Sequence, residues 1–368
     1  MKRNLFVTRP FLPPLEEFLP YLEAIWDSGQ LTNGARFHQE LERGLTERFG
    51  FPQISLFCNG TIALVTALQS LRISGEAITT PFTFAATAHS LTWNGIKPVF
   101  VDIEEDSFNI DPSLIEAAIT PRTSAIMPVH VFGRPCKTAE IDEIARRYGL
   151  KVIYDAAHAF AVNCDCGTLM SSGDLSVLSF HATKMFHTFE GGAIVSHNVE
   201  TKTRIDHLKN FGFLSDTQIV APGINGKLSE IHAAMGLLQL EYLDEVLERR
   251  QKVDQYYRNE LADVSWLSLP SLPDVKQYNY AYFPILVDTS VKAARDQLFK
   301  KLVSEGINAR RYFYPLVSEF SPYRSLSSAQ NANLPVAKRI AESVLCLPIY
   351  PDLSEKDLER IVRAVKGL

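Results

Sequence analysis

The chain has 368 residues, of which 46% are hydrophobic and 21% are charged, and its net charge is −5. This length and composition are typical of a globular protein with about two domains, and they exclude a disordered chain. The mildly acidic charge gives no reason to expect binding to nucleic acid or to a membrane surface, and no run of about 18 apolar residues could span a bilayer.

The N-terminal segment has two early basic residues but no apolar run typical of a signal peptide, so we expect a cytoplasmic protein. The five cysteines are odd in number and scattered, which is not the pattern of a disulfide framework. Cys164 and Cys166 form a C-x-C pair, but no second pair is present to complete a metal site. We therefore expect reduced thiols and no metal.

Helical periodicity predicts two amphipathic helices over 14–28 and 36–49, each followed by a glycine, Gly29 or Gly50. From residue 75 onward, short apolar runs alternate with helical patterns. The runs expected to form strands are 75–81, 97–103, 123–132, 151–157, 176–183 and 192–197. Strands separated by helices indicate a mostly parallel sheet with helices on both faces.

A long helical pattern over 229–262 is expected to join this sheet domain to the rest of the chain. A linker follows at 270–276. The elements predicted after it are a strand at 279–287, a helix at about 291–305 and a last helix at 354–366. The sequence thus predicts a large domain over 1–250, including the N-terminal helices, and a small C-terminal α+β domain over 251–368.

Two charged residues follow predicted strands. Asp155 ends an apolar run, and ligands of α/β proteins bind at the carboxyl ends of strands, although a solvated loop acid is the simpler interpretation of a lone Asp. Lys184 also follows a strand, and the small and polar residues around it suit a pocket wall, although exposed lysines are usually solubilising. A partly buried lysine has a lowered pKa and attacks carbonyl groups.

Asn59, Gly60 and Thr61 lie between an apolar run and a helical pattern. The free N–H groups at such a helix start can bind a phosphate, but Asn and Thr are also ordinary capping residues. Neither a P-loop nor a dinucleotide-binding motif is present there. The segment 223–227, with the sequence GINGK, has the pattern of a loop before a helix.

In their order along the chain, several motifs together resemble the DegT/DnrJ/EryC1/StrS family of sugar aminotransferases, which are fold-type I enzymes that use pyridoxal phosphate (PLP). The motifs are SGQLTNG, CNGTIALVTAL, TTPFTFAAT, SFHATK, EGGAIVS and GINGKLSEIHAAMGLLQL. The resemblance covers nearly the whole chain. It implies an α/β fold of type I, with a mostly parallel seven-stranded sheet in the large domain and a small α+β C-terminal domain.

The resemblance also implies the roles of single residues. Lys184 would form a Schiff base with PLP, and Asp155 would bind the pyridine nitrogen, with pyridoxamine phosphate as the intermediate form of the cofactor. His158, at a position usually occupied by Gln, would lie against the ring, and Phe84, otherwise a core aromatic, would stack on it. The residues implied at the phosphate are Gly60, Thr61, Ser179 and, from the neighbouring subunit of a homodimer, Asn225. The residues implied at the substrates are Thr32, Lys227, Arg311 and Tyr314, although 310–314 could instead be an aromatic hinge.

The implied reaction transfers the amino group of L-glutamate to a nucleotide-linked keto-deoxysugar destined for O-antigen and lipopolysaccharide. The N-terminal motifs favour dTDP-4-keto-6-deoxy-D-glucose as the acceptor, giving dTDP-4-amino-4,6-dideoxy-D-glucose; a dTDP-3-keto-6-deoxyhexose is the alternative. The dehydratases of the family have His in place of Lys184. A non-catalytic regulator that binds PLP or a nucleotide-sugar is an alternative of another class, and the complete set of Asp155, Lys184, Thr61 and Ser179 argues against it.

Overall fold

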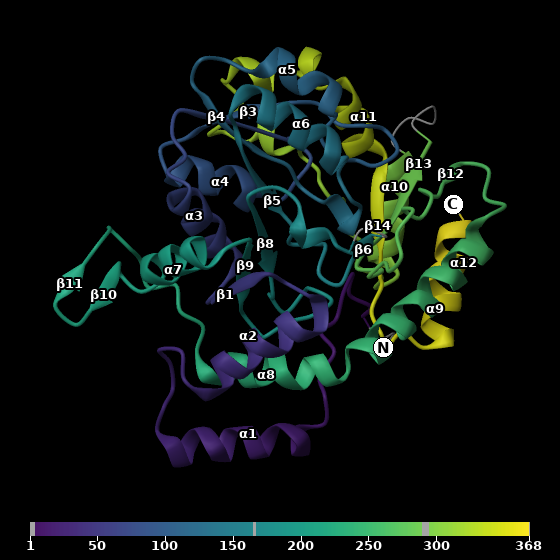
Figure 1. Cartoon of the computed structure of the whole chain (residues 1–368). Helices are drawn as coiled ribbons and strands as arrows, with labels where there is room; N and C mark the ends of the chain where they lie inside the picture. Colours follow the sequence, from purple (N-terminus) through teal and green to yellow (C-terminus); the bar gives the residue numbers. More distant parts are fainter. Residues whose placement is uncertain (1–3, 165–166, 289–293, 368) are drawn as a thin grey trace.

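The structure is a computed structural model that describes residues 4–164, 167–288 and 294–367, so Cys166 of the C-x-C pair lies outside the described residues. The strands of the central sheet are β1 (Gln53–Phe57), β2 (Glu76–Thr79), β3 (Lys97–Phe100), β4 (Thr123–Met127), β5 (Lys151–Asp155), β8 (Leu175–Ser179) and β9 (Gly192–Ser196). Their order across the sheet is β1-β9-β8-β5-β4-β2-β3 (Figure 1). Only β9 runs against its neighbours, because it is antiparallel to both β1 and β8, and the other pairs are parallel. The prediction of a mostly parallel seven-stranded sheet is confirmed.

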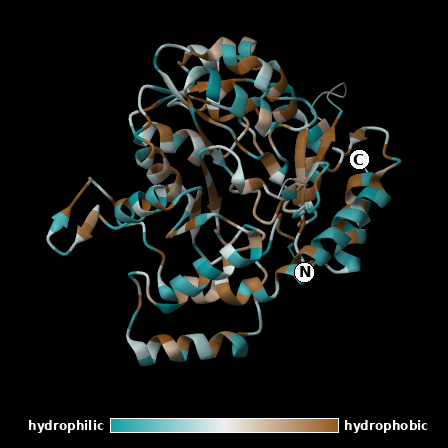
Figure 2. Cartoon of the chain, viewed as in Figure 1, coloured by the Kyte–Doolittle hydropathy of each residue, from teal (hydrophilic) through white to brown (hydrophobic). Residues whose placement is uncertain are grey.

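Both faces of this sheet are covered by helices, which explains why its strands are continuous apolar runs. The helices concerned are α3 (Gly60–Ser70), α4 (Ala85–Trp93), α5 (Ile115–Ala118), α6 (Thr138–Tyr148) and α7 (Val199–Leu208). On one face, apolar side chains of α3, α4 and α7 pack against Ala77 and Ile153. On the other, those of α5 and α6 pack against Ile78 and Tyr154. Figure 2 shows the central strands as largely hydrophobic, whereas hydrophilic and hydrophobic residues alternate along the helices.

The N-terminal helices end where the sequence predicts. Helix α1 (Leu15–Ser28) ends at Gly29 and α2 (Arg36–Phe49) at Gly50, with φ angles of 64° and 65°. This left-handed conformation is one that glycine adopts without steric cost. Helix α8 (Glu230–Glu241) packs with α1 and α2 in one hydrophobic core, and α1 lies apart from the sheet in Figure 1.

The expectation of one continuous helical pattern over 229–262 is wrong, because the structure divides it at Tyr242 into α8 and α9 (Leu243–Leu261). The Tyr242 hydroxyl donates to the Glu17 carboxylate of α1 over 2.6 Å, and its ring lies 5.3 Å from that of Phe11. These contacts with the N-terminal segment hold the break, so α8 stays beside α1 while α9 leaves in another direction (Figure 1).

The C-terminal part is built on a small antiparallel sheet. Its elements are β12 (Leu267–Ser268), β13 (Phe283–Val287), α10 (Ala294–Ser304), α11 (Pro335–Ser343), β14 (Val344–Leu347) and α12 (Glu355–Lys366). Helix α9 contributes Val246 to the core of the N-terminal helices and Val253 to the C-terminal core. Residue 250 therefore lies within α9, and the domain division at that residue stays a prediction.

The remaining elements are short. Two ribbons form from β6 (Asn163–Cys164) with β7 (Gly167–Thr168) and from β10 (Phe213–Ser215) with β11 (Gln218–Ile219), and the second projects from the body (Figure 1). The 3-10 helices are Pro112–Leu114, Val131–Gly133, Leu169–Ser171, Val317–Glu319, Ser327–Ala329 and Asn331–Asn333. None of the helices in the described ranges is both long and apolar enough to cross a bilayer.

Candidate active site

A cavity of about 340 Å³ opens where the central sheet strands β5 and β8 end. In α/β proteins, ligands bind outside the carboxyl ends of the strands. The predicted residues that line this cavity are Gly60, Thr61, Phe84, Asp155, His158, Ser179 and Lys184. The fold thus brings together side chains that are up to 124 positions apart in the sequence, from Gly60 to Lys184.

Lys184 lies in the loop that joins β8 to β9. The Phe180 N–H donates to the Gly191 carbonyl over 2.8 Å and the Thr188 N–H donates to the Phe180 carbonyl over 2.9 Å, so the two ends of the loop are held together. Loss of surrounding water lowers the pKa of Lys184 to about 8, and the charge of Asp155 opposes this shift. A lysine with such a pKa has a substantial neutral fraction near neutral pH, which nucleophilic attack on a carbonyl requires.

The lowered pKa of Lys184 predicts a pH profile. We expect the rate at which the cofactor-free protein reacts with PLP to rise with pH and to level off above about pH 8, because only the neutral amine is nucleophilic. For an ordinary lysine the rise would continue to about pH 10. Stopped-flow absorbance at a series of pH values measures this, and a rate still rising steeply at pH 9.5 or so would contradict the lowered pKa.

Asp155 lies at the end of β5 and is buried. The Thr87 hydroxyl donates to its Oδ2 over 2.7 Å, and the Ala157 N–H donates to its Oδ1 over 3.1 Å. Burial raises its pKa, and the two hydrogen bonds and the charge of Lys184 only partly offset this effect. A buried carboxylate in this position is stabilised by a cation, and the protonated nitrogen of a pyridine ring is such a cation. The site therefore fits the ring of PLP.

The N-terminal end of α3 forms another wall of the cavity. The Asn59 side chain caps this helix by accepting the Ile62 N–H over 2.8 Å, and Gly60 and Thr61 begin it. A Cβ atom on Gly60 would lie only 3.0 Å from the Cβ of Ser179, so the helix start and the end of β8 are close together. Helix N–H groups beside a hydroxyl fit a phosphate.

Aromatic rings also line the cavity, together with Asp155 and the start of α3. Phe84 is 63% exposed although it is a large apolar residue, so its ring is free to contact a bound molecule. His158 is buried, and its ring is parallel to that of Phe313 with centroids 5.9 Å apart. Its Nδ1 accepts the Phe132 N–H over 3.2 Å, and burial lowers its pKa well below the usual value. His158 is therefore neutral, with its proton on Nε2.

Five predicted residues lie outside this cavity of their own chain. Thr32 and Asn225 are exposed, and Lys227 donates to the Asn210 side chain over 2.6 Å. Arg311 and Tyr314 line a second cavity of about 260 Å³. The residues that border both cavities are Thr83, Phe84, Tyr312 and Phe313. The roles expected for these five predicted residues at the substrates and at the partner's phosphate stay predictions.

Several lining residues were not among the predicted ones. Tyr282 comes from the C-terminal part of the chain, and no local pattern distinguishes it from a core aromatic. Tyr312 and Phe313 were not named singly, but they belong to the segment 310–314, which was expected either at the substrates or as an aromatic hinge. His181 and Glu190 also line the cavity, and their side chains lie 3.4 Å apart. Both belong to the polar segment around Lys184, which is the signal that could have found them. In the described part of the chain, no three His, Cys, Asp or Glu residues are grouped to hold a metal.

The comparisons with known proteins agree with this geometry. Residues 15–366 match the DegT/DnrJ/EryC1/StrS aminotransferase family. The chain is 54% identical over 368 residues to a dTDP-4-amino-4,6-dideoxy-D-glucose transaminase of Shigella dysenteriae, covering 100% of both chains, and 51% identical over 366 residues to one of Escherichia coli, covering 99% of both. The crystal structure of DesI in the presence of its TDP-sugar product is 36% identical, with a TM-score of 0.95, and the match covers 100% of this chain and 93% of that one. The chain therefore belongs to the DegT/DnrJ/EryC1/StrS aminotransferase family.

Proposed function

We propose that the protein is a PLP-dependent aminotransferase that transfers the amino group of L-glutamate to dTDP-4-keto-6-deoxy-D-glucose and yields dTDP-4-amino-4,6-dideoxy-D-glucose. The observation that carries this proposal is the 54% identity, over the full length, to a transaminase named for that product. The cavity supports it, because Lys184 and Asp155 line the same space beside a helix start.

The chemistry is divided between the cofactor and the protein. Bound PLP supplies an aldehyde that accepts the amino group and a ring that withdraws electrons from the reacting carbon. Lys184 would hold the cofactor, and its amine would take the proton from the α-carbon of the amino donor. Asp155 would keep a positive charge on the ring nitrogen, and the start of α3 with Ser179 would bind the phosphate. Glutamate leaves as 2-oxoglutarate, and the keto-sugar receives the amino group.

Two alternatives are less well supported. A dTDP-3-keto-6-deoxyhexose as acceptor has no counterpart among the named relatives above, both of which are transaminases for the 4-amino sugar. A non-catalytic regulator also has no counterpart among these two relatives, because both are named as transaminases.

A product assay tests the proposed acceptor. We expect the enzyme with PLP and L-glutamate to convert dTDP-4-keto-6-deoxy-D-glucose to its 4-amino product, with one 2-oxoglutarate released for each amino-sugar formed. The 3-keto isomer is the matched control, and mass spectrometry with NMR of the product assigns the aminated carbon. Conversion of the 3-keto isomer alone would show that the acceptor is wrong.

We further infer that the enzyme is a cytoplasmic homodimer whose product enters O-antigen and lipopolysaccharide synthesis. The dimer would bring Asn225 to the cofactor phosphate of the partner. It is supported by exposed apolar side chains on α1 and on the β10–β11 ribbon, namely Leu15, Leu19, Trp26, Phe213, Leu214 and Ile219. Such groups commonly lie in interfaces. A solution mass equal to the 41.3 kDa of a single chain, measured by light scattering, would contradict the dimer.

A further inference from the structure

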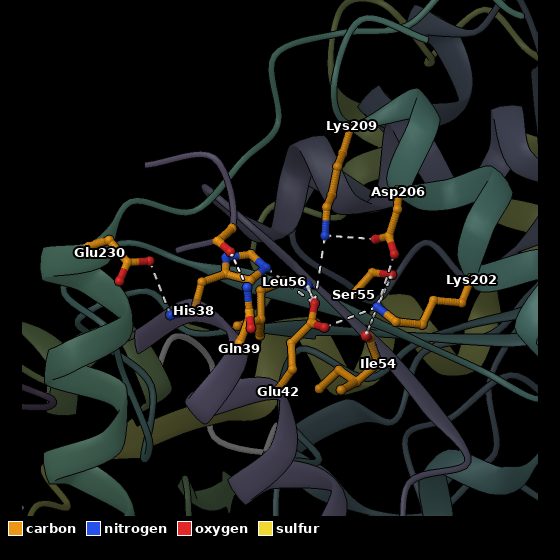
Figure 3. Close-up of polar contacts among 11 residues, drawn as sticks. His38, Gln39, Glu42, Ile54, Ser55, Leu56, Lys202, Asp206, Lys209 and Glu230 are labelled. Carbon is orange, nitrogen blue, oxygen red and sulfur yellow. Dashed lines mark hydrogen bonds and ion pairs between the residues drawn. The ribbon is translucent and has the colours of Figure 1, made fainter. Parts of the chain in front are cut away.

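A cluster of charged side chains lies beside β1, the first strand of the central sheet, and Figure 3 shows its contacts. None of its four residues lines the cavity. Its carboxylates are Glu42 of α2 and Asp206 of α7, and its amines are Lys202 and Lys209. The Lys202 amine lies 3.0 Å from each carboxylate, and the Lys209 amine lies 2.7 Å from Asp206 and 3.7 Å from Glu42. The two negative and two positive charges balance, so the cluster adds no net charge to the sheet edge.

This cluster makes hydrogen bonds to the main chain of β1 at its free edge. Strand β1 is the first in the sheet order, and within the described sheet it pairs with β9 only. On its other side, the Lys202 amine donates to the Ile54 carbonyl over 2.6 Å, and the Leu56 N–H donates to the Glu42 carboxylate over 3.2 Å. Charged side chains thus take the place of a further strand and fix the position of β1 from outside the sheet.

Glu42 is the centre of the cluster, because from α2 it contacts the edge of β1 and both lysines. Burial alone would raise its pKa, but the hydrogen bond with His38 and the charges of Lys209 and Lys202 outweigh burial and hold the pKa at about 2. The carboxylate therefore stays ionised at every pH at which the enzyme would work. Breaking a buried ion pair by removing one partner is strongly destabilising, because it leaves the other charge uncompensated.

The position of β1 determines where the phosphate site begins. Gly60, the first residue of α3, follows the last residue of β1 by three positions. Between them, the Lys209 amine lies 5.8 Å from the centre of the Phe57 ring, and the Cys58 N–H donates to the Gly226 carbonyl over 2.8 Å. A Cβ atom on Gly192 would come within 2.7 Å of the Gly60 nitrogen, so the helix start packs directly on β9, the strand that pairs with β1.

We propose that Glu42 is a positioning residue for the cofactor: through the edge of β1 it sets the place of Gly60 and Thr61 and so the affinity for the PLP phosphate. The inference rests on the proposed function, because it assumes that PLP binds with its phosphate at the start of α3. A partly buried charge cluster on the far side of β1 would then affect the binding of one chemical group, the phosphate.

The test compares PLP with pyridoxal, which has the same aldehyde and ring but no phosphate. We expect Glu42→Gln to weaken the affinity of the cofactor-free protein for PLP about tenfold and to leave that for pyridoxal within about twofold, because only phosphate contacts are displaced. Absorbance titration of the lysine-bound cofactor measures both affinities. A role in overall stability alone would weaken both ligands equally, and that result would overturn the proposal.

Two further variants make the result decisive. Lys202→Gln removes the other contact to the β1 edge, so it should lower the ratio of PLP to pyridoxal affinity in the same direction, and it stands in if Glu42→Gln does not fold. Glu40→Gln is the matched control, since it breaks a 2.8 Å ion pair with Arg36 on the same helix and should leave the ratio unchanged. An unchanged ratio in both cluster variants would overturn the inference. A wild-type protein that does not prefer PLP over pyridoxal would instead refute the phosphate site itself, and the product assay tests the transaminase activity separately.

Discussion

Replacing Lys184 with alanine is expected to remove the absorption band of lysine-bound PLP and to lower the transamination rate at least about 10⁴-fold. The reason is that, on the proposed function, one amine, with a pKa lowered to about 8 by loss of water, would both hold the cofactor and move the proton at the donor carbon. No other lysine lines the described cavity. Spectra of the purified variant and a single-turnover assay with L-glutamate measure the two effects separately.

The control for this variant is Lys137→Ala, which removes a lysine that is half-exposed and paired with Glu104 on the surface. It should keep the absorption band and the wild-type rate. A Lys184→Ala protein that retains the band would show that a different lysine holds the cofactor, and the assignment of the site would then be wrong. Partial rescue of the rate by added methylamine would support a role of the Lys184 amine as a base.

The second substitution for which we expect a large loss of activity is Asp155→Asn. We expect it to lower kcat about 10²- to 10³-fold while PLP stays bound, because the neutral amide cannot keep a positive charge on the ring nitrogen. The asparagine has nearly the same shape, so the Ala157 N–H retains an acceptor. A shift in the pH dependence of the bound-cofactor spectrum, measured along with kcat, distinguishes loss of the charge from loss of binding.

Thr87→Val is the matched comparison for Asp155→Asn. It removes the 2.7 Å hydrogen bond to the carboxylate but leaves the charge, so the expected loss in rate is only about tenfold. If Asp155→Asn and Thr87→Val had equal effects, the carboxylate would act through its hydrogen bond rather than its charge. A wild-type rate in Asp155→Asn would contradict the pairing with the ring nitrogen.

The parts of the fold that depend on local sequence could be predicted. The ends of α1 and α2 follow from Gly29 and Gly50, and the central strands follow from their apolar runs. The break between α8 and α9 could not be predicted, because Tyr242 is held by a hydrogen bond to Glu17, 225 positions away. A contact between residues so far apart in the sequence leaves no signal in the local periodicity of the helical pattern.

The same distinction applies to the site. Asp155 and Lys184 each end or follow an apolar run, and strand ends of one sheet meet at one edge, so their proximity follows from the sequence. Tyr282 and Phe313 belong to the C-terminal part of the chain, and they line the cavity only because that part packs against the central sheet domain. For Asn225, the expected contact is with a second subunit, so its place depends on the assembly as much as on the chain.

The hydrogen bonds that hold together the ends of the β8–β9 loop have a consequence for the motion of Lys184. Because Phe180 is hydrogen-bonded to both Gly191 and Thr188, the main chain beneath the lysine is anchored at its base to two adjacent strands. Movement of the Lys184 amine within the cavity then needs rotation about side-chain bonds only, which takes nanoseconds or less rather than the microseconds or longer of collective motions. The main chain at the base of this segment can therefore stay in place while the lysine side chain moves.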